Sequence, residues 1–258
     1  MPSHSNILMS PPKPGLVPED FVGLLSHATE LPIIGGQAVH WWSNYFSLPK
    51  IENQPLTSRD LDLWADRAEV KTFGKDSKLP IEFPGEYDMT VLSGIALCTI
   101  GAVKTQIEFL HTVPGLDINA RESTTVKQKW MDLSITLLDP ISLLITKLHA
   151  LRNFRQDNRQ DALHLKVCLL ASNAFITEAL GQSGKLALWY VERILRLAVQ
   201  SRHLRLAAKY GFDLREAIPI QQIQMRITEL GSQSEAANVL DRFLNLRWPE
   251  VNKKINVP

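Results

Sequence analysis

Two aspartates that lie two residues apart, Asp60 and Asp62, place the strongest constraint on how this chain can fold. They alternate with Leu61 and Leu63, and a period of two is typical of a strand with one buried face. Both carboxylates then project from the same face of the strand, where they repel each other unless a cation lies between them. Because Mg²⁺ prefers oxygen ligands of this kind, the sequence predicts a strand that presents a magnesium site.

A glycine pair, Gly35-Gly36, follows the short apolar run Leu31 to Ile34. We expect the run to form a buried strand and the glycines to form a turn at which the backbone approaches a ligand closely. Helical spacing follows, with Trp41 placed off an apolar face that consists of Ala38, Val39, Trp42 and Phe46. Since the N–H groups of a glycine turn can bind phosphate, the turn and the acidic pair together indicate a nucleotide site.

The series Gly35-Gly36, an aromatic helix and then Ser58-Arg59-Asp60-Leu61-Asp62-Leu63 resembles the polymerase-β-type nucleotidyltransferase superfamily, and within it the abortive-infection (AbiEii-like) toxins. The resemblance implies transfer of a nucleoside monophosphate from an NTP to an acceptor hydroxyl, with two-metal Mg²⁺ chemistry. Asp60 and Asp62 would be metal ligands, and Gly35, Gly36 and Ser58 would lie at the nucleotide. It also implies an RNA or tRNA acceptor and an antitoxin protein as partner, in a toxin-antitoxin or phage-defence system.

A third carboxylate is required by this chemistry, and two glutamates compete for the role. Glu108 lies near the end of a strand expected over residues 102–110, and we prefer it as metal ligand and catalytic residue. Glu82 has the same Ile-Glu-Phe context. Its strand is short and is flanked by Pro80 and Pro84, which favours an edge strand or a loop.

A second signature lies on two helices further along the chain. Asp139-Pro140 predicts the start of the first helix, because Asp is a favoured N-cap and Pro a favoured first residue. By the same resemblance, Lys147 on this helix would neutralise the triphosphate, and Asp161 at the start of the next helix would pair with Lys147 or position it. The sequence departs from the family pattern at His164, where a second Asp is common. Three nearby arginines give this joint a positive character suited to phosphate: Arg152, Arg155 and Arg159.

Composition sets wider limits on the fold. The chain has 258 residues, of which 45% are hydrophobic, so it can bury a large core. We expect an α+β fold: a small mixed sheet with flanking helices over residues 19–138, then a helical domain over 139–248. Residues 1–18 are rich in Pro and Ser and read as a flexible arm, and residues 249–258 as a polar tail. We expect helix breaks near Gly181 to Gly184, Gly211 and Gly231, and a last helix from Ser234 that ends before Pro249.

The charge and cysteine content agree with a cytoplasmic protein. The formal charge of +1 argues against a strongly basic nucleic-acid binder, although a local basic patch is compatible with it. Cys98 and Cys168 lack the spacing of metal ligands. The sequence contains no long apolar run and no signal pattern, so we expect neither insertion into a membrane nor secretion. Two other functions stay open: a small-molecule adenylyltransferase of the aminoglycoside type, and a catalytically degenerate domain that binds a nucleotide or a protein.

Overall fold

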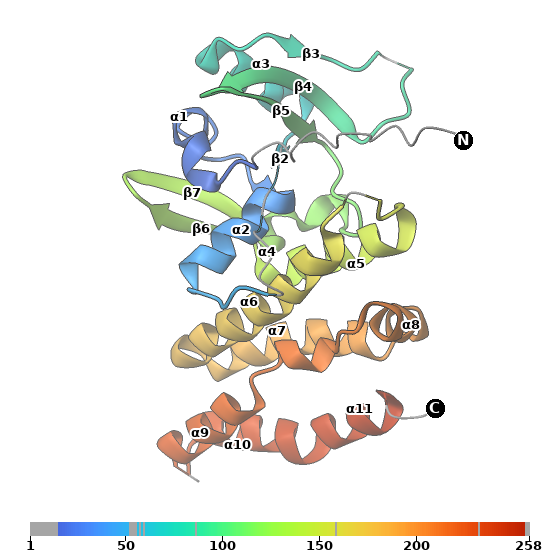
Figure 1. The fold of residues 1–258 in the computed structure, drawn as a ribbon. Helices are drawn as coiled ribbons and strands as arrows, with labels where there is room; N and C mark the ends of the chain where they lie inside the picture. Colours follow the sequence, from blue (N-terminus) through green and yellow to red (C-terminus); the bar gives the residue numbers. More distant parts are fainter. Residues whose placement is uncertain are drawn as a thin grey trace, which may run out of the picture.

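The computed structural model describes residues 15–51, 56, 58, 60–85, 87–157, 159–231 and 233–255. One mixed sheet of seven strands forms one end of the described molecule, and the helices that follow it in the chain form the other end (Figure 1). The predicted α+β class is confirmed at this level.

The strands lie in the order β3-β4-β5-β2-β1-β7-β6 across the sheet. Two pairs are parallel, β1 with β7 and β2 with β5, and the others are antiparallel. The predicted strand at 102–110 is confirmed as β5, and the last two strands, β6 and β7, form a hairpin. The bounds are β1 (Ile33–Ile34), β2 (Leu61–Trp64), β3 (Ile81–Glu82), β4 (Leu92–Ile100), β5 (Val103–Leu110), β6 (Thr125–Trp130) and β7 (Leu133–Leu138).

Helices flank the sheet and then continue alone. Those within the sheet region are η1 (Pro18–Phe21), α1 (Val22–Leu25), α2 (Gly35–Tyr45), α3 (Arg67–Ser77), η2 (Ile118–Ala120) and α4 (Arg121–Thr124). After β7 come α5 (Pro140–Asn153), α6 (Asp161–Gln182), α7 (Gly184–Ala198), α8 (Ser201–Tyr210), η3 (Leu214–Ala217), α9 (Ile220–Leu230), α10 (Glu235–Arg242), a π-helical segment (Phe243–Arg247) and α11 (Trp248–Ile255). Asp139 caps α5 as expected, since its carboxylate accepts a hydrogen bond from the Ser142 N–H at 2.7 Å.

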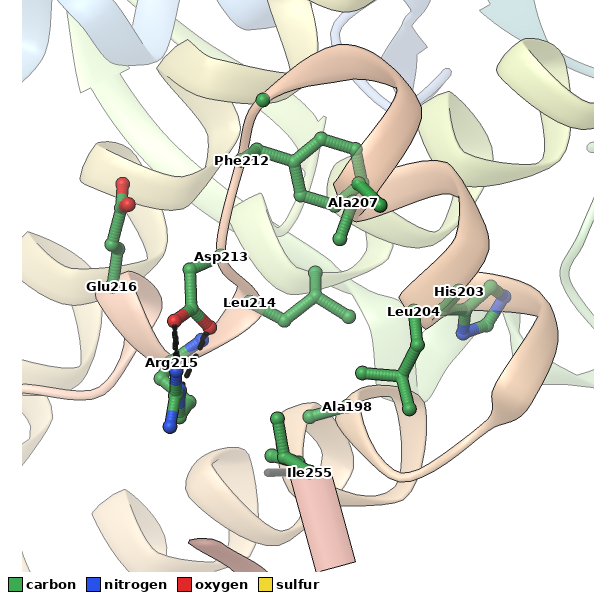
Figure 2. A pocket seen from close by; sticks show the side chains of 12 residues that line it. Ala198, His203, Leu204, Ala207, Phe212, Asp213, Leu214, Arg215, Glu216 and Ile255 are labelled. Atoms are coloured by element: carbon green, nitrogen blue, oxygen red, sulfur yellow. Dashed lines mark hydrogen bonds and ion pairs between the residues drawn. The ribbon is translucent and has the colours of Figure 1, made fainter. Parts of the chain in front are cut away.

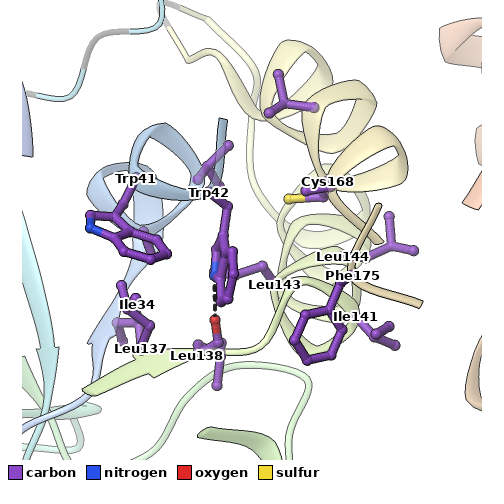
Figure 3. Close-up of a cluster of buried hydrophobic side chains, with 14 of the residues drawn as sticks. Ile34, Trp41, Trp42, Leu137, Leu138, Ile141, Leu143, Leu144, Cys168 and Phe175 are labelled. Atoms are coloured by element: carbon purple, nitrogen blue, oxygen red, sulfur yellow. Dashed lines mark hydrogen bonds between the residues drawn. The ribbon is translucent and has the colours of Figure 1, made fainter. Parts of the chain in front are cut away.

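The core joins the sheet to the first of these helices. Trp42 of α2 is fully buried, and its indole N–H donates a hydrogen bond to the Leu138 carbonyl at the end of β7, 2.9 Å away (Figure 3). Phe175 of α6 lies edge-on to the same indole. One connected cluster of buried side chains therefore spans the sheet and the helices. The boundary at residues 138 and 139 stays a prediction.

Several expectations for the first part of the chain are corrected. The glycine pair does not form a separate turn, because Gly35, at φ +66°, is itself the first residue of α2. Trp41 is buried at 4% exposure, since it stacks on Tyr45 and packs at a right angle to Trp42. The expected arm differs at its end: Leu16 is 5% exposed and bridges to Ser58. Residues 1–14 lie outside the described residues.

Other corrections fall later in the chain. The sequence reading missed α3 and β4, and it missed a break at Val199 and Gln200 that separates α7 from α8. The expected end before Pro249 is wrong. Pro249 is the second residue of α11, which continues directly from the π-helical segment, so the expected tail is helical as far as Ile255.

Helix α6 is, among the described residues, the one helix long and apolar enough to cross a membrane. Two thirds of its apolar window, 67%, is buried inside the protein. This burial is consistent with the core helix of a soluble protein.

Candidate active site

A row of residues across the sheet brings the predicted carboxylates together. In the strand register Asp62 of β2 lies beside Glu108 of the parallel strand β5, and beside Ile34 of β1 on its other side. Adjacent strands are about 4.8 Å apart, and register neighbours project from the same face. Leu61 and Leu63 are at most 1% exposed, so the carboxylates occupy the opposite, more open face.

The rival glutamate lies in the same row but further away. Glu82 of β3 is paired with Ile95 of β4, and Ile95 in turn with Glu108. Two strand spacings therefore separate Glu82 from Glu108, about 10 Å. As expected, β3 is a short strand at the edge of the sheet. The geometry favours Glu108 as the third carboxylate.

The first residue of α2 lies directly against this row. A Cβ atom added to Gly35 would fall 1.8 Å from Oδ2 of Asp62, and the φ of +66° at Gly35 is one that L side chains rarely adopt. A Cβ on Gly36 would come within 2.7 Å of the Ser58 hydroxyl and 3.2 Å of Cε1 of His164. Both glycines are therefore required for the close approach of α2 to the acidic residues.

The start of α2 has no side-chain cap. Its N-cap residue, Ile34, makes no side-chain capping hydrogen bond. The first N–H groups of a helix have no partner within the helix, so an uncapped start can bind phosphate. The nearby Ser58 hydroxyl donates to the Asp60 carbonyl at 3.0 Å, which fixes the segment that leads into β2. Arg59, between these two residues, lies outside the described part of the chain.

Electrostatics make the acidic residues costly to ionise together. Burial, followed by the charges of Glu108 and Asp60, raises the pKa of Asp62 to about 7. Burial and the charge of Asp60 likewise raise the pKa of Glu108. Gln106 orients the Glu108 carboxylate through a hydrogen bond of 3.0 Å from its amide nitrogen. Three carboxylates thus lie close enough to disfavour one another's charge.

Cations border the same site from α5 and α6. Lys147 is 8% exposed, and its Nζ lies 3.0 Å from Oδ1 of Asp161. Arg159 binds the other oxygen of Asp161 at 2.5 Å, while 45% of its side chain stays exposed. The charges of Lys147 and Arg159 both act on the pKa of Asp62, and that of Arg159 also acts on Glu108. The expected pairing of Lys147 with Asp161 is observed, and Lys147 is buried rather than solvated.

Arg159 is the residue whose importance the sequence understates. Three arginines were expected to make the joint positive, and Arg159 is the one that contacts Asp161 and faces the carboxylates. Its guanidinium is held by Asp161 and remains accessible, a combination suited to phosphate. The Arg159-Gln160-Asp161 order is a possible signal, since an Arg two residues before a helical Asp can fold back onto it.

His164 completes the boundary of the site. It is 6% exposed, its Nδ1 is buried without a partner, and burial with the charge of Lys147 lowers its pKa to about 3. The imidazole is therefore neutral at physiological pH. His164 lies next to Gly36, and it is the position at which this sequence departs from the family pattern.

Whether this site suits Mg²⁺ can be judged from its donors. Among the described residues no group of three or more His, Cys, Asp or Glu side chains is arranged to hold a metal ion by itself. Protein Mg²⁺ sites commonly use one or two carboxylates and complete their coordination with water and substrate phosphate. The acidic row, with its raised pKa values and an uncapped helix start beside it, fits that arrangement.

Cavities occur next to the site and away from it. One of about 340 Å³ lies along α2 beyond the glycines, with His40, Ser43 and Asn44 in its wall. A larger one, of about 410 Å³, lies at the other end of the molecule between α8, η3 and α11, where Asp213 and Arg215 pair (Figure 2). The larger cavity contains none of the predicted site residues.

Comparison with models of known protein families and with curated proteins finds no match.

Proposed function

We propose that this protein is a Mg²⁺-dependent nucleotidyltransferase with a polymerase-β-type core, which moves a nucleoside monophosphate from an NTP to an acceptor hydroxyl. The observation that carries the proposal is the register of Asp62 with Glu108 on parallel strands, with Gly35 packed against Asp62. This arrangement combines an acidic row with an uncapped helix start, and so provides for a metal and a phosphate at one place.

Asp60 and Asp62 would hold Mg²⁺, with Glu108 at the edge of the same cluster. The bound ion would neutralise charge on the phosphates and on the leaving pyrophosphate. The first N–H groups of α2 would bind phosphate oxygens, and Arg159, held by Asp161, would bind the outer phosphates. Lys147 acts through its ion pair with Asp161 and its field at Asp62, rather than as an exposed phosphate ligand.

Glu108 is placed to act as the base. An acceptor O–H attacks the α-phosphorus, the bond from that phosphorus to the bridging oxygen breaks, and pyrophosphate leaves. The acceptor proton passes to Glu108, whose raised pKa makes its carboxylate a better base than an ordinary glutamate. Its hydrogen bond from Gln106 keeps the carboxylate oriented.

The acceptor is proposed to be RNA, and the resemblance to AbiEii-like toxins supports a role in phage defence with an antitoxin partner. The test is transfer of label from each α-³²P-labelled NTP, with Mg²⁺, to total RNA and to the protein itself. We expect labelled RNA from wild type, and a loss on the order of 10²-fold or more for Asp60→Asn/Asp62→Asn.

A matched control removes two exposed carboxylates, Asp76→Asn/Asp132→Asn, and should keep full activity. Label on RNA that persists in Asp60→Asn/Asp62→Asn would contradict the assignment of the site. Transfer only to a small hydroxylated molecule such as an aminoglycoside would replace the RNA acceptor. No transfer to any acceptor, with nucleotide binding intact, would indicate a degenerate domain.

A further inference from the structure

A small cavity between α5 and α8 is lined by basic side chains. It has a volume of about 220 Å³, and its polar lining side chains are His149 and Arg152 from α5 with Arg202 and His203 from α8. We call these four residues and the cavity the basic pocket. The remaining wall consists of Gly115, Ile145, Leu148 and Leu197. No carboxylate is among the residues that line it.

The charges in the basic pocket are not balanced from within the protein. Arg152 has no hydrogen-bond or ion-pair partner in the part of the chain that the structure describes. Arg202 binds Gln200 through Nε at 2.8 Å, which leaves its two terminal nitrogens without a partner among those residues. Both guanidinium groups are exposed and border one cavity, so an anion bound there would interact with two cations.

The charges of both arginines act on the pKa values of both histidines. Burial and the charges of Arg152 and Arg202 lower the pKa of His149, and the same arginines act in the same direction on His203. No acidic side chain contributes to either shift. The Nδ1 of His149 is buried without a partner, whereas that of His203 lies 3.0 Å from the Leu197 carbonyl.

The size of the cavity limits the kind of ligand that can bind in it. Sites for whole nucleotides or drug-sized molecules usually exceed about 300 Å³. A cavity of about 220 Å³ bordered by two guanidinium groups suits one tetrahedral oxyanion, because arginine binds phosphate with two parallel hydrogen bonds. We therefore propose that the basic pocket binds a phosphate group, either of a nucleic-acid strand or of a free phosphate ester.

The position of the pocket is separate from the candidate active site. Lys147 and Arg152 are five residues apart on α5, which is about 7.5 Å along the helix axis. Lys147 pairs with Asp161 of α6, whereas Arg152 lines a cavity shared with α8. The inference does not depend on the transfer reaction, but a strand bound in this pocket would lie near the carboxylates.

The test follows the imidazole Cε1–H signals of His149 and His203 by NMR while inorganic phosphate replaces chloride at constant ionic strength. The His149→Gln variant assigns the signals. We expect saturable shifts in wild type, and at least a roughly tenfold loss of phosphate affinity in Arg152→Gln/Arg202→Gln. The matched control, Arg155→Gln/Arg205→Gln, removes two exposed arginines outside the pocket and should bind phosphate as wild type does.

A second arm identifies the source of the phosphate. Binding of a fluorescein-labelled single-stranded RNA is measured against salt concentration for the same proteins. If the pocket binds a strand, the slope of log K against log salt falls by about 1.4 in Arg152→Gln/Arg202→Gln, at about 0.7 for each lost contact. An unchanged slope with lost phosphate binding assigns the pocket to a free phosphate ester. Unsaturable shifts in wild type, or equal phosphate affinities in the two double variants, would overturn the proposal.

Discussion

Asp62 and Asp161 border the same site and differ in the charged groups that surround them. Asp161 is 2% exposed and has a cation on each oxygen, and although burial opposes it, Lys147 and Arg159 lower its pKa. Burial and the charges of Glu108 and Asp60 raise the pKa of Asp62 to about 7, although the charges of Lys147 and Arg159 act in the opposite direction. The charge of Asp161 is thus compensated within the protein by two contacting cations, whereas the charge of Asp62 is compensated only in part.

The difference separates a structural from a functional use of the same residue type. A paired buried carboxylate holds α5, α6 and Arg159 in a fixed arrangement. A carboxylate held against like charges destabilises the folded protein until a cation binds, and perturbed residues of this kind cluster at functional sites. The variants below are arranged from the largest expected effect on stability to the smallest.

Lys147→Ala should cost the most, about 3–5 kcal/mol in the free energy of unfolding, because it leaves Asp161 buried with half its compensation. Urea unfolding monitored by tryptophan fluorescence provides the measurement. The control is Lys127→Ala, which breaks an exposed pair with Glu30 and should cost less than about 1 kcal/mol. Equal losses for the two variants would show that Asp161 does not depend on Lys147.

Gly35→Ala should cost about 2–3 kcal/mol and also disrupt the site. A methyl group at this φ is strained, and it would collide with Asp62. Gly101→Ala is the matched control, because Gly101 has a φ of +58° with no atom within 4 Å of an added Cβ, so it carries the strain alone. Identical losses of stability and of nucleotide affinity in both variants would show that the collision with Asp62 has no effect.

Asp62→Asn should stabilise the protein, by an amount on the order of 1–3 kcal/mol at pH 8. The pKa of Asp62 is raised from 3.8 to about 7, so the folded state holds a proton that the unfolded state has lost. The penalty is absent below pH 3.8, grows as pH rises to about 7 and is constant above. Unfolding at pH 4 and pH 8 measures it, and a gain that is independent of pH would contradict the assigned cause.

The elements and site residues that depend on local sequence pattern could be predicted from the sequence. The alternation around Asp60 and Asp62 predicted β2, although this strand begins at Leu61 and Asp60 lies in the bend before it. Asp139-Pro140 predicted the start of α5. The resemblance placed Lys147 with Asp161 across two helices, and the ion pair is observed.

The other parts of the site depend on how distant strands and helices are placed beside one another, which local sequence pattern does not encode. Glu82 and Glu108 share the same neighbours in sequence, and only the insertion of β4 between their strands separates them in space. That strand was missed because it contains Gly94 and Ala96, which have low strand propensity. The basic pocket combines α5 with α8, whose break from α7 was also missed, so its residues gave no common signal.

The most direct test of the central claim compares wild type with Asp62→Asn in thermal unfolding at pH 8, in EDTA and in excess MgCl₂ with a non-hydrolysable NTP analogue. A divalent cation that binds the acidic row should stabilise wild type and have little effect on the variant. We expect Asp62→Asn to be the more stable protein in EDTA, and its advantage to disappear or reverse with Mg²⁺ and nucleotide. Equal stabilisation of both proteins, or of neither, would contradict this expectation.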